Sequence, residues 1–279
     1  MAKISSPYPI LSLDDVFDKL RRRENAGAHP VRQSYLAMYS SWLGGIVRSP
    51  ELMFVPADDH IVHRGDGVFE AIKYVDGKIC LLDRHLDRLG RSASLIGLKM
   101  PVTPAELREI CVATARAAPE SAPESAPESA GVLRVYLSRG PGGFGPNPYD
   151  SIASQVYVVA TRFNETPARR AERLRQGVSA RHSEIPVKSG VFSIIKSCNY
   201  LPNVMMKKEA VDSGVDFSIG LDGNGFLAEG PTENFAIVSD SRELLVPEFA
   251  QTLRGITVTR CMELAPQLIK QGLLTGVRH

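Results

Sequence analysis

The 279-residue sequence lacks several features that would place it in common protein classes. Its four cysteines, at positions 80, 111, 198 and 261, form no Cys-x-x-Cys pair and have no histidine at metal-ligand spacing. We therefore expect reduced thiols and no metal site. No apolar stretch approaches the roughly 20 residues that a membrane-spanning helix needs, and the N-terminus has no signal-peptide core. The net charge of +2 gives no basic footprint for nucleic acid or membranes. These absences predict a cytoplasmic protein without nucleic-acid or membrane partners.

The sequence also lacks the two common glycine-rich nucleotide fingerprints. It contains instead short strands, helices and many hairpin signals, such as Asp76-Gly77 between two β-rich runs. Later segments predict strands over 173–182 and 191–196, a helix over 199–213 and a last helix from about Gly255. This mixture predicts an α+β fold with largely antiparallel strands rather than a doubly wound parallel sheet.

At roughly 150 residues per domain, the length predicts two domains or one large one. We expect an N-terminal α+β domain over 1–163, a linker over 164–171 and a C-terminal domain over 172–279. Residues 118–129 are three repeats of Ala-Pro-Glu-Ser. Proline in each repeat prevents a regular helix, and the segment has no core-forming residue, so we expect a flexible surface loop.

One lysine, Lys196, stands out because of its neighbours. It follows the apolar run 191–195 and precedes a turn and a helix, which predicts a lysine at the end of a buried strand. A desolvated lysine has a lowered pKa, and its neutral amine is a nucleophile for carbonyl groups, so Schiff-base chemistry is one hypothesis. The alternative is a strand-end lysine whose ammonium reaches water.

Three further elements suit an anionic cofactor with a basic ring. Glu229 follows an apolar run and would pair with a protonated pyridine nitrogen. Arg88 lies on a predicted helix and suits a phosphate group, although an ion pair with Asp83 or Asp87 is the alternative. Ile256 and Thr257 open the last helix, where free N–H groups favour an anion, although Thr257 as a simple N-cap is the alternative.

Five motifs in one order carry a family resemblance, and they cover about residues 32 to 265. The sequence resembles the class IV aminotransferases, the fold-type IV pyridoxal-phosphate enzymes, and within them most of all the plant-type D-amino-acid transaminase branch. It also resembles branched-chain aminotransferases and aminodeoxychorismate lyases. The motifs are HRGDGVFEAI, HLDRLGRSAS, IKSCNYLPNV, EGPTENFAIV and LRGITVTR.

The resemblance implies a two-domain fold, a pyridoxal 5'-phosphate cofactor and a homodimer. It assigns the cofactor Schiff base and the proton transfer to Lys196, and the pyridine nitrogen to Glu229. Arg88, with Ile256 and Thr257, would hold the phosphate. Tyr200 would contact the phenolic oxygen of the cofactor, although its spacing from the lysine is one residue shorter than in the branched-chain enzymes.

The sequence also departs from the family. Pro231, Ala236 and Val258 replace the usual small, aromatic and basic residues. The family usually continues past the last helix with a strand and a Gly-Thr loop that completes the phosphate site, whereas this sequence ends at LLTGVRH. Two interpretations stay open, a truncated C-terminal region or an incomplete phosphate site.

The resemblance implies ping-pong transamination between an amino acid, of D or branched-chain type, and a 2-oxo acid. Arg64 and Arg139 are candidates for the substrate carboxylate, with an ion pair to Asp66 or Asp150 as the alternative. The stretch LSRGPGGFG resembles aminodeoxychorismate lyases, so formation of 4-aminobenzoate and pyruvate is a second hypothesis. An inactive homologue that acts as a binding protein is a third.

Overall fold

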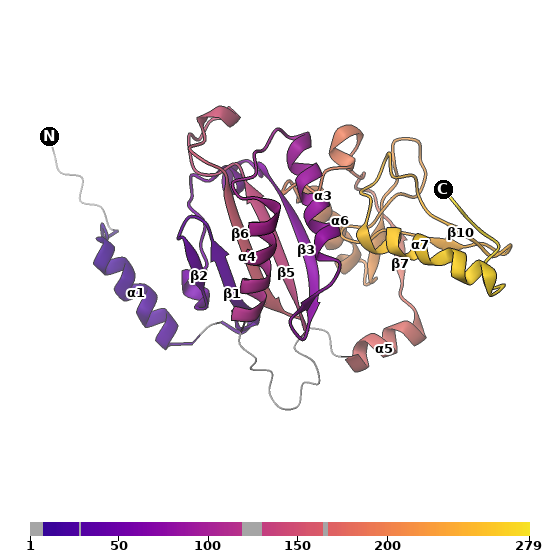
Figure 1. Cartoon of the computed structure of the whole chain (residues 1–279), viewed down its shortest axis with the longest axis horizontal. Helices are drawn as coiled ribbons and strands as arrows, with labels where there is room; N and C mark the ends of the chain where they lie inside the picture. Colours follow the sequence, from indigo (N-terminus) through magenta and orange to yellow (C-terminus); the bar gives the residue numbers. More distant parts are fainter. Residues whose placement is uncertain (1–7, 28, 119–129, 164–166) are drawn as a thin grey trace.

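The computed structural model describes residues 8–27, 29–118, 130–163 and 167–279 (Figure 1). Its main feature is a six-stranded sheet with the order β2-β1-β6-β5-β3-β4, in which all neighbours are antiparallel. The strands are β1 (Tyr35–Ser40), β2 (Gly45–Val47), β3 (Gly67–Val75), β4 (Lys78–Ile79), β5 (Ala130–Ser138) and β6 (Gln155–Arg162). The helices that precede β5 are α1 (Leu13–Asn25), α2 (His60–His63), α3 (Leu82–Leu95) and α4 (Pro104–Ala117).

The rest of the chain forms a smaller second part, which Figure 1 shows beyond α3 from the large sheet. β7 pairs with β8 in parallel, and β10 pairs with β9 in an antiparallel and with β11 in a parallel arrangement. The elements are α5 (Pro167–Gln176), β7 (Ala180–His182), α6 (Leu201–Asp212), β8 (Phe217–Ile219), β9 (Ile237–Val238), β10 (Glu243–Leu245), α7 (Ile256–Lys270) and β11 (Gly276–Arg278). The predicted α+β class with largely antiparallel strands is confirmed.

Local sequence signals explain several of these elements. Asp76 and Gly77 both have positive φ, 48° and 72°, as the tight turn between β3 and β4 requires. The Thr103 hydroxyl accepts from the Glu106 N–H at the start of α4, and the Glu106 carboxylate accepts from the Thr103 N–H, which completes a capping box. Both elements form where the sequence predicts them, because their signals lie within a few residues.

The main core lies between one face of the sheet and helices α3 and α4 (Figure 1). Alternate residues of β5 face these helices and are fully buried, as the two-residue period of a strand requires. The buried side chains that fill this layer include Ile72, Leu89, Leu107, Cys111, Leu133, Val135 and Leu137. The core holds β3 and α3 in a fixed relation, and both elements contribute to the site described below.

Two predicted strands are wrong. Residues 173–176 belong to helix α5, whose arginine- and glutamate-rich sequence favours a helix, and only 180–182 form a strand. Residues 190–193 form a 3₁₀ turn, in which Val191 and Phe192 are exposed. The apolar run therefore does not mark a buried strand, because apolar composition alone does not fix the strand period.

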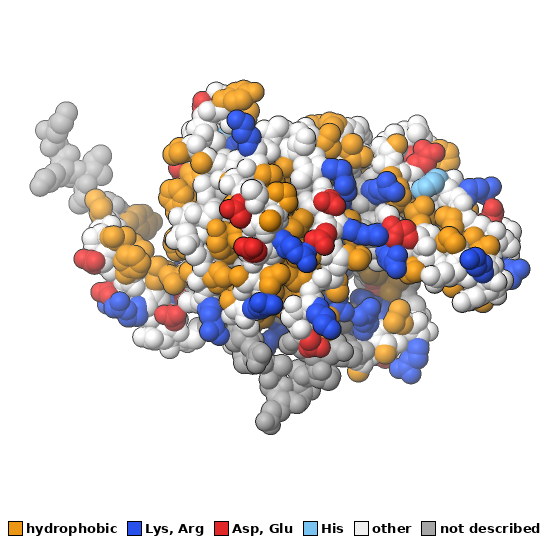
Figure 2. Space-filling model, in the orientation of Figure 1, with side chains coloured by type: hydrophobic (Ala, Val, Ile, Leu, Met, Phe, Trp, Pro, Cys, Tyr) orange, Lys and Arg blue, Asp and Glu red, His pale blue; other side chains and the backbone are white. Residues whose placement is uncertain are grey.

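The predicted domain division stays a prediction. Within the proposed linker, residues 167–171 lie in α5 and 164–166 lie outside the described residues. Residues 119–129 of the repeat segment also lie outside them. Over the described ranges, no helix has the length and apolar content needed to cross a bilayer. Figure 2 shows acidic and basic side chains interspersed over one face.

Gly131 provides a test of the packing between β5 and its neighbours. A Cβ atom at this position would lie 2.3 Å from the Tyr74 ring and 2.4 Å from the Thr161 carbonyl oxygen. We expect Gly131→Ala to lower the free energy of unfolding by about 1–3 kcal/mol, because neither neighbour can move without disturbing the sheet. Urea denaturation followed by circular dichroism measures this.

Gly90 on α3 is the matched control, because a Cβ there would have no atom within 4 Å. We expect Gly90→Ala to leave the stability unchanged or raise it by up to about 1 kcal/mol, through the better helix propensity of alanine. Equal effects of the two substitutions would contradict the packing argument.

Candidate active site

Lys196 lies beside the free edge of β3. The short strand β4 pairs only with Tyr74 and Val75, so the first half of β3 has no strand on that side. Residues 196–198 occupy the gap: the Phe69 N–H donates to the Lys196 carbonyl and the Cys198 N–H donates to the Gly67 carbonyl, both at 2.9 Å. The backbone of Lys196 is therefore fixed by the large sheet, although the residue does not end a continuous strand.

The side chain of Lys196 lies in a largely desolvated, aromatic environment. Its Nζ atom is 4.7 Å from the ring centre of Phe69 and 5.8 Å from that of Tyr200. Burial, assisted by the positive charge of Arg88, lowers the pKa of Lys196 to about 8, although the charges of Glu70 and Glu229 oppose the shift. About a tenth of the amine is therefore neutral at pH 7, which makes Lys196 a nucleophile near neutral pH.

Glu229 lies in a turn that follows the loop after β8, on the same cavity as Lys196. Its Oε2 atom accepts a hydrogen bond from the Leu253 N–H at 3.2 Å. Burial raises the pKa of Glu229 to about 7, while this hydrogen bond and the charges of Lys188, Lys196 and Arg88 oppose the rise. Because the carboxyl is desolvated, a cationic ligand group would hold it in the ionised form.

Arg88 is buried and paired with Glu70 of β3. Its Nε and a terminal nitrogen donate to the two carboxylate oxygens at 2.7 and 2.6 Å, and His85 contacts the same carboxylate at 2.7 Å. Burial alone would raise the pKa of Glu70, but these partners outweigh it and hold that pKa below its usual value. The alternative pairing of Arg88 with Asp83 or Asp87 is wrong.

The start of α7 lies next to Arg88. The second terminal nitrogen of Arg88 donates to the Arg254 carbonyl at 3.1 Å, two residues before Ile256. Gly255 is the N-cap and supplies no capping side chain, and a Cβ there would fall 1.6 Å from the Asn234 side-chain oxygen. Thr257 is therefore not the N-cap, and the helix start lacks a side-chain acceptor for its first amides.

The cavity brings together several predicted residues and others that the sequence did not indicate. Lys196, Tyr200 and Glu229 line it, whereas Arg88, Ile256 and Thr257 do not. Burial raises the pKa of the Tyr200 phenol to about 12, so it stays protonated as a hydrogen-bond donor. The full lining is Lys188, Ser193, Ile195, Lys196, Tyr200, Asn203, Glu229, Gly230, Pro231, Thr232, Glu233, Asn234 and Leu253.

Lys188 and Asn203 are the additions of most interest. Asn203 donates to the Pro231 carbonyl at 2.7 Å, while its Oδ1 atom is buried and has no partner among the described residues. Its place one turn after Tyr200 in the motif IKSCNYLPNV was the available signal. No local signal marks Lys188, which reaches the cavity from the loop after β7.

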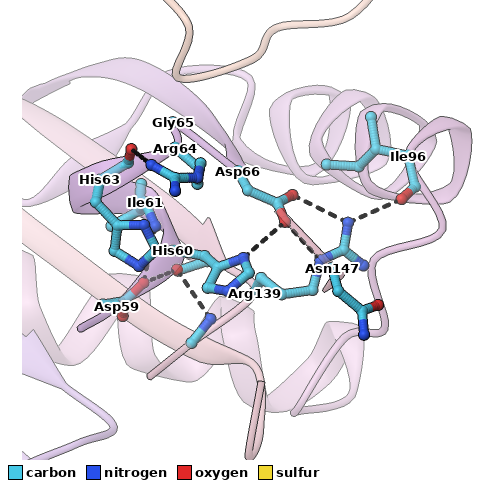
Figure 3. Close-up of polar contacts among 12 residues, drawn as sticks. Asp59, His60, Ile61, His63, Arg64, Gly65, Asp66, Ile96, Arg139 and Asn147 are labelled. Atoms are coloured by element: carbon cyan, nitrogen blue, oxygen red, sulfur yellow. Dashed lines mark hydrogen bonds and ion pairs between the residues drawn. The ribbon is translucent and has the colours of Figure 1, made fainter. Parts of the chain in front are cut away.

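Arg64 and Arg139 lie away from the cavity lining, in the network of Figure 3. Arg139 forms a bidentate ion pair with Asp66 at 2.9 and 3.0 Å and donates to the carbonyls of Ile96 and Gly97 (Figure 3). The exposed Arg64 donates to the carbonyls of its neighbours in space, His63 and Phe144. A role of these arginines in substrate binding stays a prediction.

Comparisons with known proteins agree with this arrangement. The family model "Amino-transferase class IV" matches residues 67–275, more than half of the chain. A chloroplastic D-amino-acid transaminase from Arabidopsis thaliana is 36% identical over 273 residues, which cover 97% of this chain and 67% of the relative. A bifunctional aminodeoxychorismate lyase and D-amino acid transaminase from Mycobacterium tuberculosis is 31% identical over 238 residues, 80% of this chain and 76% of the relative.

Solved structures that superpose on this chain are also aminotransferases. The Escherichia coli branched-chain amino acid aminotransferase superposes with a TM-score of 0.74 at 27% identity, over 88% of this chain and 77% of that one. A hypothetical aminotransferase from Mycobacterium tuberculosis in its PLP-bound form superposes with a TM-score of 0.70 at 29% identity, over 87% of this chain and 81% of that one. The fold of this chain is therefore that of the fold-type IV aminotransferases.

The desolvation of Lys196 has a cost in stability that can be measured. A base whose pKa falls from 10.5 to about 8 on folding destabilises the folded state fully below pH 8, and this cost disappears as the pH rises to about 10.5. We expect Lys196→Met to raise the free energy of unfolding of the cofactor-free protein by about 2 kcal/mol at pH 7 and by little near pH 10.5.

Urea denaturation over this pH range tests the expectation. Lys207→Met is the control, because Lys207 is an exposed lysine that also contacts an aromatic ring, that of Phe217. The free energy of unfolding of the Lys207→Met variant should stay within about 0.5 kcal/mol of the wild-type value. A gain from Lys196→Met that does not depend on pH would show that the charge is not its origin.

Proposed function

Because the chain belongs to the class IV aminotransferase family, we propose that it is a transaminase that moves an amino group between an amino acid and a 2-oxo acid. Enzymes of this family use pyridoxal phosphate, and two of the solved neighbours contain it or a phosphopyridoxyl adduct. One observation supports the proposal most strongly. A lysine of lowered pKa, a half-buried carboxyl and a half-buried phenol line one cavity, at Lys196, Glu229 and Tyr200.

The residues present fit pyridoxal phosphate. Lys196 would hold its aldehyde carbon, Glu229 its ring nitrogen and Tyr200 its phenolic oxygen. Arg88 uses three of its five N–H groups on Glu70 and Arg254, so two remain for an anion. The uncapped start of α7 at Ile256 and Thr257 adds backbone N–H groups for the phosphate. The buried Oδ1 atom of Asn203 has no hydrogen-bond partner among the described residues, so a bound ligand could supply the missing donor.

Each residue then has a defined task. The bound cofactor supplies an electron sink for the negative charge that develops at the substrate α-carbon. Lys196 would take the α-proton of the substrate as general base and would return it to the acceptor carbon as general acid, and a pKa near the working pH suits both tasks. Glu229 would stabilise a positive charge at the ring nitrogen, and the protonated Tyr200 would donate a hydrogen bond that orients the ring.

The substrate is an amino acid of D or branched-chain type. This proposal rests on the named activities of relatives, among them the D-amino-acid transaminase of Arabidopsis thaliana and the branched-chain enzyme of Escherichia coli. The bifunctional relative from Mycobacterium tuberculosis and the stretch LSRGPGGFG favour aminodeoxychorismate lyase activity as the second candidate. An inactive homologue that acts as a binding protein is the third candidate.

We propose that the chain forms a homodimer through the face of the large sheet that the helices leave uncovered. α3 and α4 cover one face of the large sheet, while a mostly apolar groove runs over the other face. Two aromatic side chains that line this groove, Tyr35 and Phe163, are 36% and 37% exposed. Such a surface is typical of a subunit interface, which supports the predicted second copy.

The proposed compartment is the cytoplasm, which the four free cysteines support. The D-amino-acid transaminase of Arabidopsis thaliana, by contrast, is named as a chloroplastic protein.

The first experiment adds pyridoxal phosphate to the purified cofactor-free protein. We expect a visible absorbance band that Lys196→Ala abolishes, because Lys196 is the amine held against the cavity. D-alanine, L-leucine and aminodeoxychorismate are then assayed separately for 2-oxo-acid product, the first two with an acceptor. The proposal expects product from D-alanine or L-leucine.

Two outcomes would contradict it. Pyruvate from aminodeoxychorismate alone would identify a lyase. The absence of a visible band and of any product, in protein that folds normally by circular dichroism, would identify a binding protein.

A further inference from the structure

A second lysine, Lys188, shares the cavity with Lys196. It comes from the loop between β7 and the turn at 190–193, and its side chain is half-buried. Its Nζ atom is 5.3 Å from the ring centre of Tyr200, and Nζ of Lys196 is 5.8 Å from the same centre. Two ammonium groups therefore contact one aromatic ring inside one cavity, together with Glu229.

The ammonium of Lys188 has no ion pair among the described residues. Burial lowers the pKa of Lys188, while the charge of Glu229 opposes this. A half-buried cation without a carboxylate at contact distance costs stability, so a structural role in holding the loop by an ion pair does not account for it. What it does provide is positive charge near two groups that the proposed chemistry needs.

The charge of Lys188 lowers the pKa of both Glu229 and Lys196. Among the charges that lower the pKa of Glu229, that of Lys188 is the largest, ahead of Lys196 and Arg88. The same ammonium also adds to the lowering of the pKa of Lys196, as the smallest of the charges that act on it. The other titratable groups that face this cluster are Arg88 on α3, Glu70 on β3, Cys198 and Tyr200 beside Lys196, and Glu233 in the turn after Glu229.

We propose that Lys188 is a positioning residue of this site, whose ammonium prepares Glu229 and Lys196 to take up pyridoxal phosphate. The inference rests on the proposed function and adds a residue to it. With Lys188 present, Glu229 is ionised more readily for the ring nitrogen, and a larger share of Lys196 is neutral for the aldehyde carbon. Loss of the ammonium disfavours both conditions at neutral pH.

The test uses the cofactor-free protein and compares wild type, Lys188→Met, Lys188→Arg and Lys207→Met. Acetylation of Lys196 by dilute acetic anhydride is quantified by peptide mass spectrometry between pH 6 and 11, because only the neutral amine reacts. The wild type should have a midpoint near pH 8. Lys188→Met should raise this midpoint by about half a unit, which slows labelling at pH 7 about threefold.

The second readout is the dissociation constant of pyridoxal phosphate at pH 7, from an absorbance titration. Lys188→Met should weaken binding by about tenfold, while Lys188→Arg, which keeps the charge, should stay within about twofold of wild type. Lys207→Met should match wild type, because Lys207 contacts the Phe217 ring outside the cavity.

The outcomes separate this inference from the proposed function. An unchanged labelling midpoint in Lys188→Met would overturn the role of Lys188, and so would equal losses in Lys188→Met and Lys188→Arg. If wild-type protein does not bind pyridoxal phosphate at all, the proposed function fails, while the labelling midpoints still report whether Lys188 acts on Lys196.

Discussion

The pairing of residues 196–198 with the open edge of β3 is the constraint on which the site depends. Two backbone hydrogen bonds of 2.9 Å fix Lys196 to the large sheet, and the core between that sheet and α3 holds Glu70 against Arg88. Arg88 in turn contacts the carbonyl before α7. The backbone pairing at Lys196 and the Arg88–Arg254 hydrogen bond thus join the second part of the chain to the large sheet at the amine and at the proposed phosphate site.

Desolvation acts on both Lys196 and Glu229, the two ionisable groups at the centre of the site. Burial is the largest influence on the pKa of Lys196 and of Glu229, and it moves each toward neutrality. The cofactor-free protein therefore carries two poorly solvated ionisable groups in one cavity, which costs stability. In the proposed function, a cofactor with a basic ring and an aldehyde would relieve both, so that the same burial that destabilises the empty site would favour ligand binding.

Much of the fold follows from local signals in the sequence, but the site does so only in part. The turn at Asp76-Gly77 and the cap at Thr103 lie within a few residues of the elements that they specify. The run 191–196 misleads because its apolar side chains do not occupy a strand. Lys188 could not be identified, since its neighbours in the cavity are brought together by tertiary packing and no motif records that proximity.

The identity of the reactive amine is the central claim, and two lysines compete for it in one cavity. Borohydride reduction of the protein loaded with pyridoxal phosphate, followed by peptide mass spectrometry, decides between them because it fixes the cofactor to the nitrogen that holds it. The account predicts a pyridoxyl group on Lys196 and an unmodified Lys188. A pyridoxyl group on Lys188, or none on either lysine, would contradict it.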